Sequence, residues 1–216
     1  MPGRRRQRRT EASKIDATPP WETRLRDTPP PTTGPFDDRD APQDGIERVD
    51  LGALRLPLLD QVELRVDIDE SQQVVAATLA GPNGTMQVGV FAAPRSEGIW
   101  DEVRAEIAAS VNAQRRNSAR EQDGPWGVEL HATLPEPGSG PQGVAVRFIG
   151  VDGPRWFLRA LLAGPVATDA TLAEPFEQAL RGTVVVRGNE PLPVRDPVPL
   201  KLPPGVELPG GATPAG

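Results

Sequence analysis

Residues 143–164, GVAVRFIGVDGPRWFLRALLAG, carry the clearest structural signal in the sequence. The two apolar arms of this stretch, each about eight to ten residues long, are shorter than most stable helices. They flank Asp152-Gly153-Pro154, a triplet of turn residues, so the pattern predicts a β-hairpin. On the second arm, one face consists of Trp156, Leu158, Ala160 and Leu162, and the other of Arg155, Phe157, Arg159 and Leu161. A short helix over residues 154–163, with proline in its first turn, is the alternative that stays open.

Alternating patterns also precede the hairpin. VELRVDID, residues 62–69, places apolar residues on one side and charged residues on the other, which is typical of a strand with one exposed face. QVVAATLA (73–80) and TMQVGVFAA (85–93) predict two further strands joined by the turn GPNG. ERVDLGALRLP (47–57) predicts a short first strand that ends at its proline. We expect the three segments within residues 62–93 to form an antiparallel meander, with the strand at 47–57 ahead of it.

The remaining segments add helices and strands. IWDEVRAEIAASVNAQRR, residues 99–116, has apolar residues at helical spacing and acidic residues near its N-terminal end, so it predicts a helix. GPWGVELHATL (124–134) alternates like a half-exposed strand, TLAEPFEQALR (171–181) predicts a short amphipathic helix, and GTVVVRG (182–188) predicts a final strand. The expected fold is α+β, an antiparallel sheet of about seven to eight strands packed against one long and one short helix.

The composition predicts disordered ends. The 216 residues include 26 prolines and 22 glycines but are only 37% hydrophobic and 4% aromatic, which is too turn-rich for a chain folded throughout. We expect a disordered N-terminal arm over residues 1–45, a single α+β domain over 46–190 and a proline-rich tail over 191–216. Phe36, within the arm, is expected to be solvated rather than docked. The first half of the tail can lie along the domain surface.

Charge and cysteine usage limit the partners and the compartment. The net charge is −6, yet the chain starts with the basic block Arg4, Arg5, Arg6, Arg8 and Arg9. Such a block can bind nucleic acid through residues 1–10, or it can act only as a solubilising tail, which is the interpretation we favour. The chain has no cysteine, no apolar run long enough to span a membrane and no apolar stretch typical of a secretory signal. These features predict a cytoplasmic protein.

No familiar catalytic or cofactor motif is present in the sequence. Its single histidine, His131, has neither a cysteine nor a second histidine with which to form a zinc site or a Cys-His pair. The glycines follow neither the dinucleotide-binding nor the P-loop spacing, and a G-x-S-x-G elbow is missing. We therefore expect no catalytic residue, no cofactor and no metal, and interpret His131 as a surface residue.

Arginines near aromatic residues are the remaining candidates for an interaction site. In the hairpin, Arg147 and Arg159 are expected to face the same side and to form a cationic strip over Phe157. Together with Arg155 and Trp156, this strip can bind a carboxylate, a phosphate or an acidic partner protein. The alternative is internal: the arginines pair with acidic residues such as Asp101, Glu102 or Asp152 and fasten the helix and turn to the sheet.

The stretches FAAPRSEGIWDEVRAEI, DGPWGVEL, RFIGVDGPRWFLRALLAG and VVVRGNEPLPVRDPVPLKLP resemble an actinobacterial family known as domain of unknown function thirty-seven ten. The resemblance covers residues 46–203 and implies a charged, variable N-terminal arm but no activity or site residue. The layout also resembles small sheet-and-helix modules of the PsbP and secretion-chaperone kinds, which bind proteins. We expect a non-catalytic protein-binding or regulatory module, with nucleic-acid association as the alternative and an enzyme of unfamiliar mechanism as a third option.

Overall fold

The computed structural model describes residues 33–71, 73–95, 97–114, 117–135 and 143–202. The chain divides into two units, residues 1–31 and 32–216, and every described residue belongs to the second.

The larger sheet contains β4 (Glu63–Ile68), β5 (Val74–Gly81), β6 (Gly84–Ala92), β7 (Ala119–Gly124), β8 (Gly127–Leu134), β9 (Val144–Gly153) and β10 (Trp156–Ala163). The smaller sheet contains β1 (Phe36–Asp37), β2 (Arg48–Asp50), β3 (Leu54–Pro57) and β11 (Val184–Val185). The helices are α2 (Trp100–Asn112) and α3 (Ala170–Arg181), with short 3-10 turns η2 (Asp38–Asp40) and η4 (Pro165–Ala167). The expected α+β class is confirmed.

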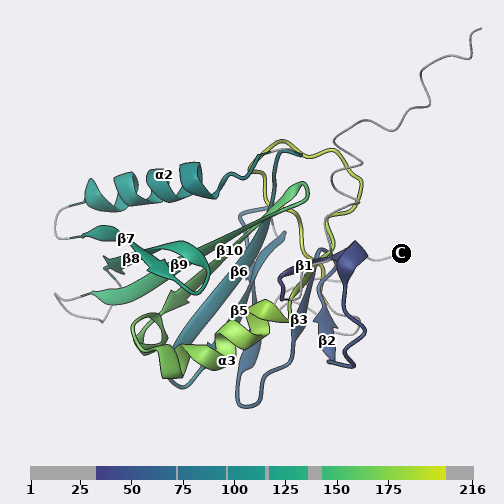
Figure 1. The fold of residues 1–216 in the computed structure, drawn as a ribbon, viewed down its shortest axis with the longest axis horizontal. Coiled ribbons are helices and arrows are strands. Elements are labelled where there is room, and N and C mark those ends of the chain that lie inside the picture. Colours follow the sequence, from purple (N-terminus) through teal and green to yellow (C-terminus); the bar gives the residue numbers. More distant parts are fainter. Residues whose placement is uncertain (1–32, 72, 96, 115–116, 136–142, 203–216) are drawn as a thin grey trace, which may run out of the picture. The chain divides into compact units, whose positions relative to one another are not determined.

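The hairpin predicted over residues 143–164 forms the middle of the larger sheet. Its strands β9 and β10 pair without interruption from Gly153 and Trp156 to Val146 and Ala163, so the helical alternative for this segment is wrong. The strand order is β4-β5-β6-β10-β9-β8-β7, and every neighbouring pair is antiparallel (Figure 1). The expected meander is likewise confirmed as β4, β5 and β6. A central hairpin of this kind presents one face to each covering layer.

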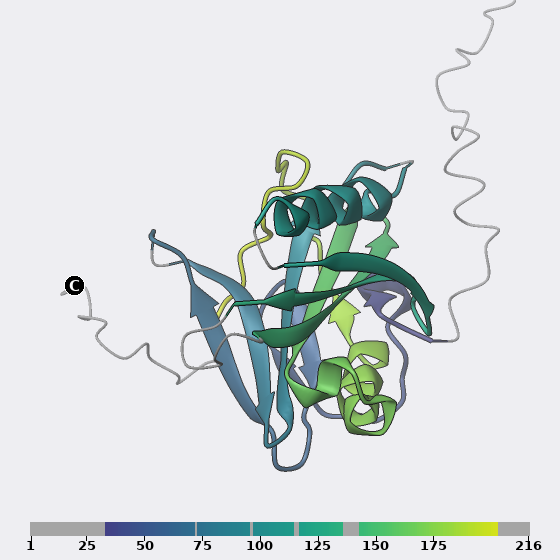
Figure 2. The same cartoon turned by 90° about the vertical axis from the view of Figure 1, so that its left-hand side faces the viewer.

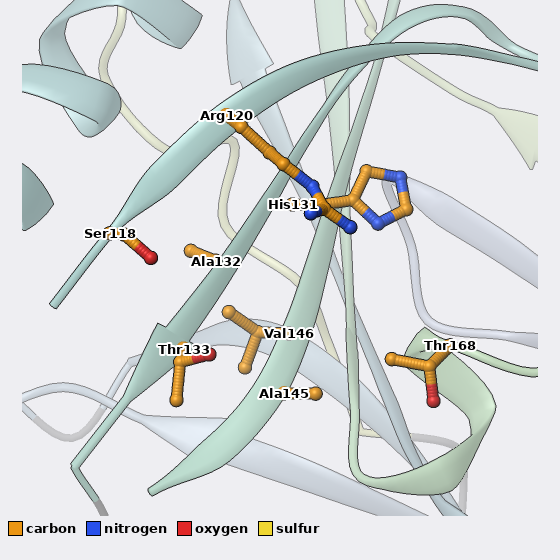
Figure 3. A pocket seen from close by; sticks show the side chains of 8 residues that line it. All are labelled: Ser118, Arg120, His131, Ala132, Thr133, Ala145, Val146 and Thr168. Carbon is orange, nitrogen blue, oxygen red and sulfur yellow. The ribbon is translucent and has the colours of Figure 1, made fainter. Parts of the chain in front are cut away.

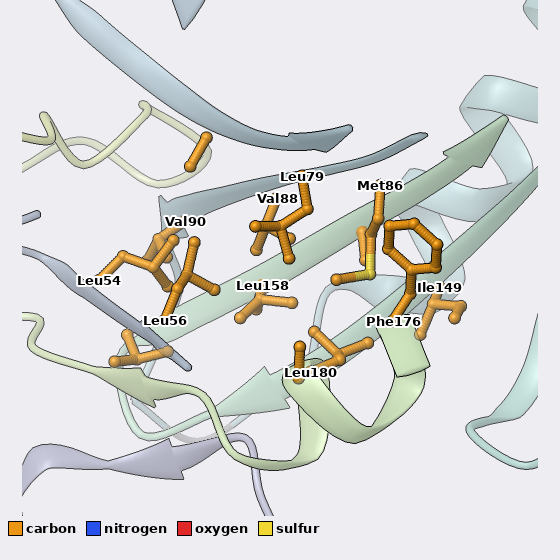
Figure 4. Packing of buried hydrophobic residues seen from close by; sticks show 14 of the residues in the cluster. Leu54, Leu56, Leu79, Met86, Val88, Val90, Ile149, Leu158, Phe176 and Leu180 are labelled. Atoms are coloured by element: carbon orange, nitrogen blue, oxygen red, sulfur yellow. The ribbon is translucent and has the colours of Figure 1, made fainter. Parts of the chain in front are cut away.

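The main core lies between the larger sheet and a layer formed by α3 and the smaller sheet. Because side chains alternate along a strand, β10 directs Trp156, Leu158 and Leu162 to this side, where each is at most 2% exposed. The cluster also includes Leu54, Leu56, Met86, Val88, Ile149, Phe176 and Leu180 (Figure 4). Burying each side chain of this size stabilises the fold by about 1.5–3 kcal/mol. The predicted face of the hairpin is therefore the core face.

Helix α2 covers the opposite face of the sheet, as Figure 2 shows. Its Trp100 ring stacks on Phe157 with centroids 5.9 Å apart, and a Cβ at Gly150 would clash with the Trp100 indole. The Asp152 carboxylate of the hairpin turn accepts hydrogen bonds from the backbone N–H groups of Ile99 (2.8 Å) and Trp100 (3.3 Å). The hairpin thus fixes where α2 begins, since a carboxylate there satisfies free N–H groups and faces the positive end of the helix.

The smaller sheet corrects the expectation of a single strand over residues 47–57. The chain turns at Gly52, whose φ of +77° suits glycine, and forms two paired strands, β2 and β3. Strand β7 was also not predicted, because its sequence AREQDG lacks apolar alternation. The first difference arises from a glycine turn inside an apolar segment, and the second from a strand with few apolar residues.

The folded region extends beyond the boundaries expected at residues 46 and 190. Phe36 is 8% exposed and pairs in β1 with Val184, so the expectation of a solvated side chain is wrong. At the other end, the Val198 N–H donates to the Val90 carbonyl and the Leu200 N–H to the Val74 carbonyl, each at 2.8 Å. The first half of the tail therefore docks on the larger sheet. Residues 1–32 and 203–216, expected to be disordered, lie outside the described residues.

Candidate functional site

Arg147, expected on the cationic strip, lies instead in a buried ion network under α3. Its guanidinium donates to both carboxylate oxygens of Glu129, at 2.6 and 2.9 Å, and to Glu177 of α3 at 2.7 Å. Arg181 adds a further bond to Glu177 at 2.8 Å. Although burial lowers the pKa of the Arg147 guanidinium, its bonds to the two glutamates outweigh this and raise the pKa above the usual value. Arg147 therefore ties α3 to the sheet.

The prediction that Arg147 and Arg159 form a cationic strip on one face is wrong. Arg147 is opposite Leu162 in the register of the hairpin, whereas Arg159 is opposite Gly150. Since paired residues share a face, Arg147 points toward α3 and Arg159 toward α2. The alternative, that arginines form ion pairs within the fold, agrees with the structure in that Arg147 links a helix to the sheet. Its partners are Glu129 and Glu177, however, and not the acidic residues that were expected.

Arg159 occupies an unusual position on the α2 face. Its guanidinium carbon lies 5.0 Å from the centroid of the Phe91 ring, and its strand neighbours on both sides are glycines, Gly89 and Gly150. Among the residues that the structure describes, no carboxylate lies within ion-pair distance of Arg159. Burial alone lowers the pKa of its guanidinium. A half-buried cation stacked on an aromatic ring retains its N–H donors for an additional acceptor.

A cavity of about 220 Å³ opens at Arg159 between α2 and the sheet. This Arg159 cavity is lined by Phe91, Ile99, Val103, Glu106, Ile107, Phe157, Arg159 and Arg195. At its rim, Arg195 of the C-terminal segment donates to Glu102 and Glu106, each at 2.7 Å. The Glu106 carboxylate is thereby paired, whereas Arg159 has no ion-pair partner among the residues that the structure describes. The cavity combines one available cation with apolar and aromatic walls.

The size of the Arg159 cavity limits what it can hold. Sites for drug-sized ligands and cofactors span about 300–1,000 Å³, so a cavity of 220 Å³ suits a single side chain or a small fragment rather than a dinucleotide. Arg159 can donate two parallel hydrogen bonds to a carboxylate or phosphate, and the rings of Phe91 and Phe157 can pack against an apolar group. The geometry therefore fits an anionic group carried by a short apolar body.

A second cavity, of about 160 Å³, lies on the α3 side and is lined by Ser118, Arg120, His131, Ala132, Thr133, Ala145, Val146 and Thr168. Figure 3 shows Arg120 and His131 projecting side by side into it from β7 and β8. His131 Nε2 lies 3.5 Å from a Glu129 oxygen, but burial outweighs this charge and lowers the pKa of His131. The prediction of an ordinary surface histidine is wrong, because only 18% of its side chain is exposed.

The other predicted interaction residues have different surroundings. Trp156 is a core residue whose Nε1–H donates to Asp37 at 2.9 Å, so it is not available to a partner in this structure. Arg155 forms the hairpin turn with a φ of 65°, and its carbonyl accepts from Ala93 N–H. Arg4, Arg5, Arg6, Arg8 and Arg9 lie outside the described residues.

Two features of the cavity escaped sequence reasoning, namely Phe91 beneath Arg159 and Arg195 at the rim. The signal for Phe91 was its place on the neighbouring strand, where it pairs with Phe157. For Arg195 the signal was indirect. The alternation of Leu192, Val194, Val198 and Leu200 indicates that its segment can lie along the domain surface, but not that Arg195 reaches α2. In the part of the chain that the structure describes, no group of acidic residues and histidine is arranged to hold a metal ion.

Comparison with protein families identifies the family to which the chain is related. The family described as "Protein of unknown function (DUF3710)" matches residues 34–208. The chain belongs to this family. The family match begins just before β1 and includes the C-terminal segment that carries Arg195, so it covers both walls of the Arg159 cavity.

Among solved structures, the chain is similar to cyanobacterial PsbP (CyanoP) from Synechocystis sp. PCC 6803. The two share 12% identity at a TM-score of 0.40, and the match covers 67% of this chain and 96% of the PsbP chain. No curated protein matches the sequence. Neither helix in the described segments has the length and apolar character needed to cross a membrane.

Proposed function

We propose that the chain is a non-catalytic, cytoplasmic module that binds another protein, and that the Arg159 cavity is its recognition site. The single observation that carries this proposal is the half-buried guanidinium of Arg159, which stacks on Phe91 without a carboxylate within ion-pair distance in the described residues. Removing a charge from water without pairing it is unfavourable for folding. Such a residue is best explained by a partner that supplies the missing acceptor.

The surroundings support a binding role. Phe157 forms the cavity floor and is 1% exposed, and the Asp152 carboxylate fixes the first turn of α2 above it. A site built on a strand and a capped helix is already ordered before binding, so the entropic cost of ordering it does not reduce the affinity for a partner. Nucleic-acid association through the arginines of residues 1–10 remains a prediction, since those residues are not described.

Affinity capture from native lysate followed by reconstitution tests this proposal. Partners captured by the wild-type chain are compared with those captured by Arg159→Gln and by Arg120→Gln, which removes the same charge from the opposite face of the sheet. We expect a purified partner to bind Arg159→Gln at least about tenfold more weakly, because a charge-assisted bond is lost, and to bind Arg120→Gln normally. Equal affinities for all three chains would refute the proposal.

A further inference from the structure

We infer that the Arg159 cavity recognises an acidic side chain flanked by a large apolar residue in a peptide segment of the partner. This inference rests on the proposed function in taking the ligand to be part of a protein, and it adds the chemistry of recognition. Its two components are the Arg159 guanidinium, which has no carboxylate partner within the described segments, and the apolar walls, which are separate observations. Together they require an anion and an apolar group in adjacent positions.

The stacking of Arg159 determines which anionic group fits. A guanidinium lying over an aromatic ring presents its N–H groups at its edge, away from the ring. A carboxylate has two oxygens spaced to accept two of these donors at once. A peptide carboxylate therefore meets a fixed, planar donor, and the adjoining side chain can reach Ile107 or Val103 on α2.

The charges around the cavity favour a single anion of modest size. The titratable groups facing it are Arg159 from β10, Glu102 and Glu106 from α2, and Arg195 from the C-terminal segment. Glu102 and Glu106 are 72% and 62% exposed at their side chains and both bond to Arg195, so water and this arginine screen them. Their residual charge disfavours a doubly charged phosphate more than a carboxylate. The volume of about 220 Å³ is likewise too small for a nucleotide.

The test compares two peptides that differ in one charge. NMR titration of the full chain with the acetylated, amidated pentapeptide ALEFA and with its isosteric partner ALQFA gives both values of Kd. We expect ALEFA to bind at least about tenfold more tightly than ALQFA, and raised salt to weaken only ALEFA. Arg159→Gln removes the difference between the peptides, whereas Arg120→Gln, the matched loss of charge, preserves it. Glu106→Gln, which removes a carboxylate from the rim, tightens the binding of ALEFA.

Several results would overturn the inference. Equal binding of the two peptides to the wild-type chain would show that the carboxylate is not recognised, whatever Arg159→Gln does. A difference that survives in Arg159→Gln would place the anion elsewhere. If neither peptide binds although a protein partner depends on Arg159, the proposed function stands and the acidic-apolar ligand is wrong. If the peptides behave as expected but no protein partner depends on Arg159, the site stands and the proposed function fails.

Discussion

Replacing Arg147 with methionine tests how the larger sheet holds α3. The substitution retains an apolar side chain of similar length but removes three hydrogen bonds, two to Glu129 and one to Glu177. The glutamate side chains are only 2% and 5% exposed, so water cannot replace the lost partner. Two buried carboxylates then remain close together, with Arg181 as the only ion-pair partner of Glu177 among the described residues other than Arg147.

The expected loss is large for a domain of this kind. Removing one partner of a buried ion pair typically costs about 3–5 kcal/mol, because an uncompensated charge stays buried. A typical domain is stable by about 5–15 kcal/mol, so this loss is a substantial fraction of the total. With a urea m value of about 2 kcal/mol/M, the unfolding midpoint falls by about 2 M.

Urea unfolding followed by circular dichroism measures this loss, and Arg65→Met is the matched control. Arg65 of β4 makes an ion pair of the same length with Glu63, at 2.6 Å, but the two side chains are 60% and 64% exposed. Exposed pairs of this type contribute little, so the control should leave the midpoint unchanged within experimental error. The triple variant Arg147→Met/Glu129→Gln/Glu177→Gln should recover most of the loss, because it contains no buried unpaired charge.

Equal midpoints for Arg147→Met and Arg65→Met would show that the buried ion network does not stabilise the fold. The same holds if the triple variant is as unstable as the single one, since the loss would then come from packing rather than from unpaired charge.

Three further predictions follow from the packing and the hydrogen bonds. Trp156→Ala should lower the free energy of unfolding by about 3–5 kcal/mol, because Trp156 is 2% exposed in the main core; a urea midpoint close to that of the wild type would contradict its core position. Asp152→Ala should cost about 1 kcal/mol and speed amide exchange at the start of α2, because the Ile99 and Trp100 N–H groups lose their acceptor; unchanged exchange would show that the carboxylate does not cap the helix. Burial lowers the pKa of His131 below the ordinary 6.5, so the unfolded chain binds this proton more readily than the fold. Stability from this group is therefore complete above about pH 6.5 and declines below it, and His131→Gln should flatten the slope in urea titrations below about pH 6.5; an unchanged slope would mean that another group titrates.

The sequence was most informative where apolar residues follow a clear period. The alternation in residues 143–164 and the helical spacing in 99–116 predicted β9, β10 and α2, because burial requires these patterns. Strand β7 shows the limit of the method. Four of its six residues are exposed polar residues, so apolar alternation is missing, and it is a strand because it pairs with β8 at the edge of the sheet.

The faces of the hairpin show why the site was harder to predict. With a three-residue turn at residues 152–154, Arg147 and Arg159 would lie opposite one another. The actual two-residue connection pairs Gly153 with Trp156, so Arg147 is opposite Leu162 instead of Arg159, and this register shift of three residues sends the two arginines to opposite faces. A strand pattern also shows which residues share a face but not what covers that face. Burial of Arg147 under α3 and the open cavity at Arg159 under α2 therefore required the tertiary structure.

A crystal structure of the chain bound to the ALEFA peptide would show directly whether Arg159 binds the peptide carboxylate. We expect the glutamate carboxylate within about 2.7–2.9 Å of the Arg159 guanidinium, the distance of a charge-assisted hydrogen bond, with an apolar side chain of the peptide against Phe157 or Ile107. A peptide seated elsewhere, or one whose carboxylate points to solvent while Arg159 stays unpaired, would contradict this expectation.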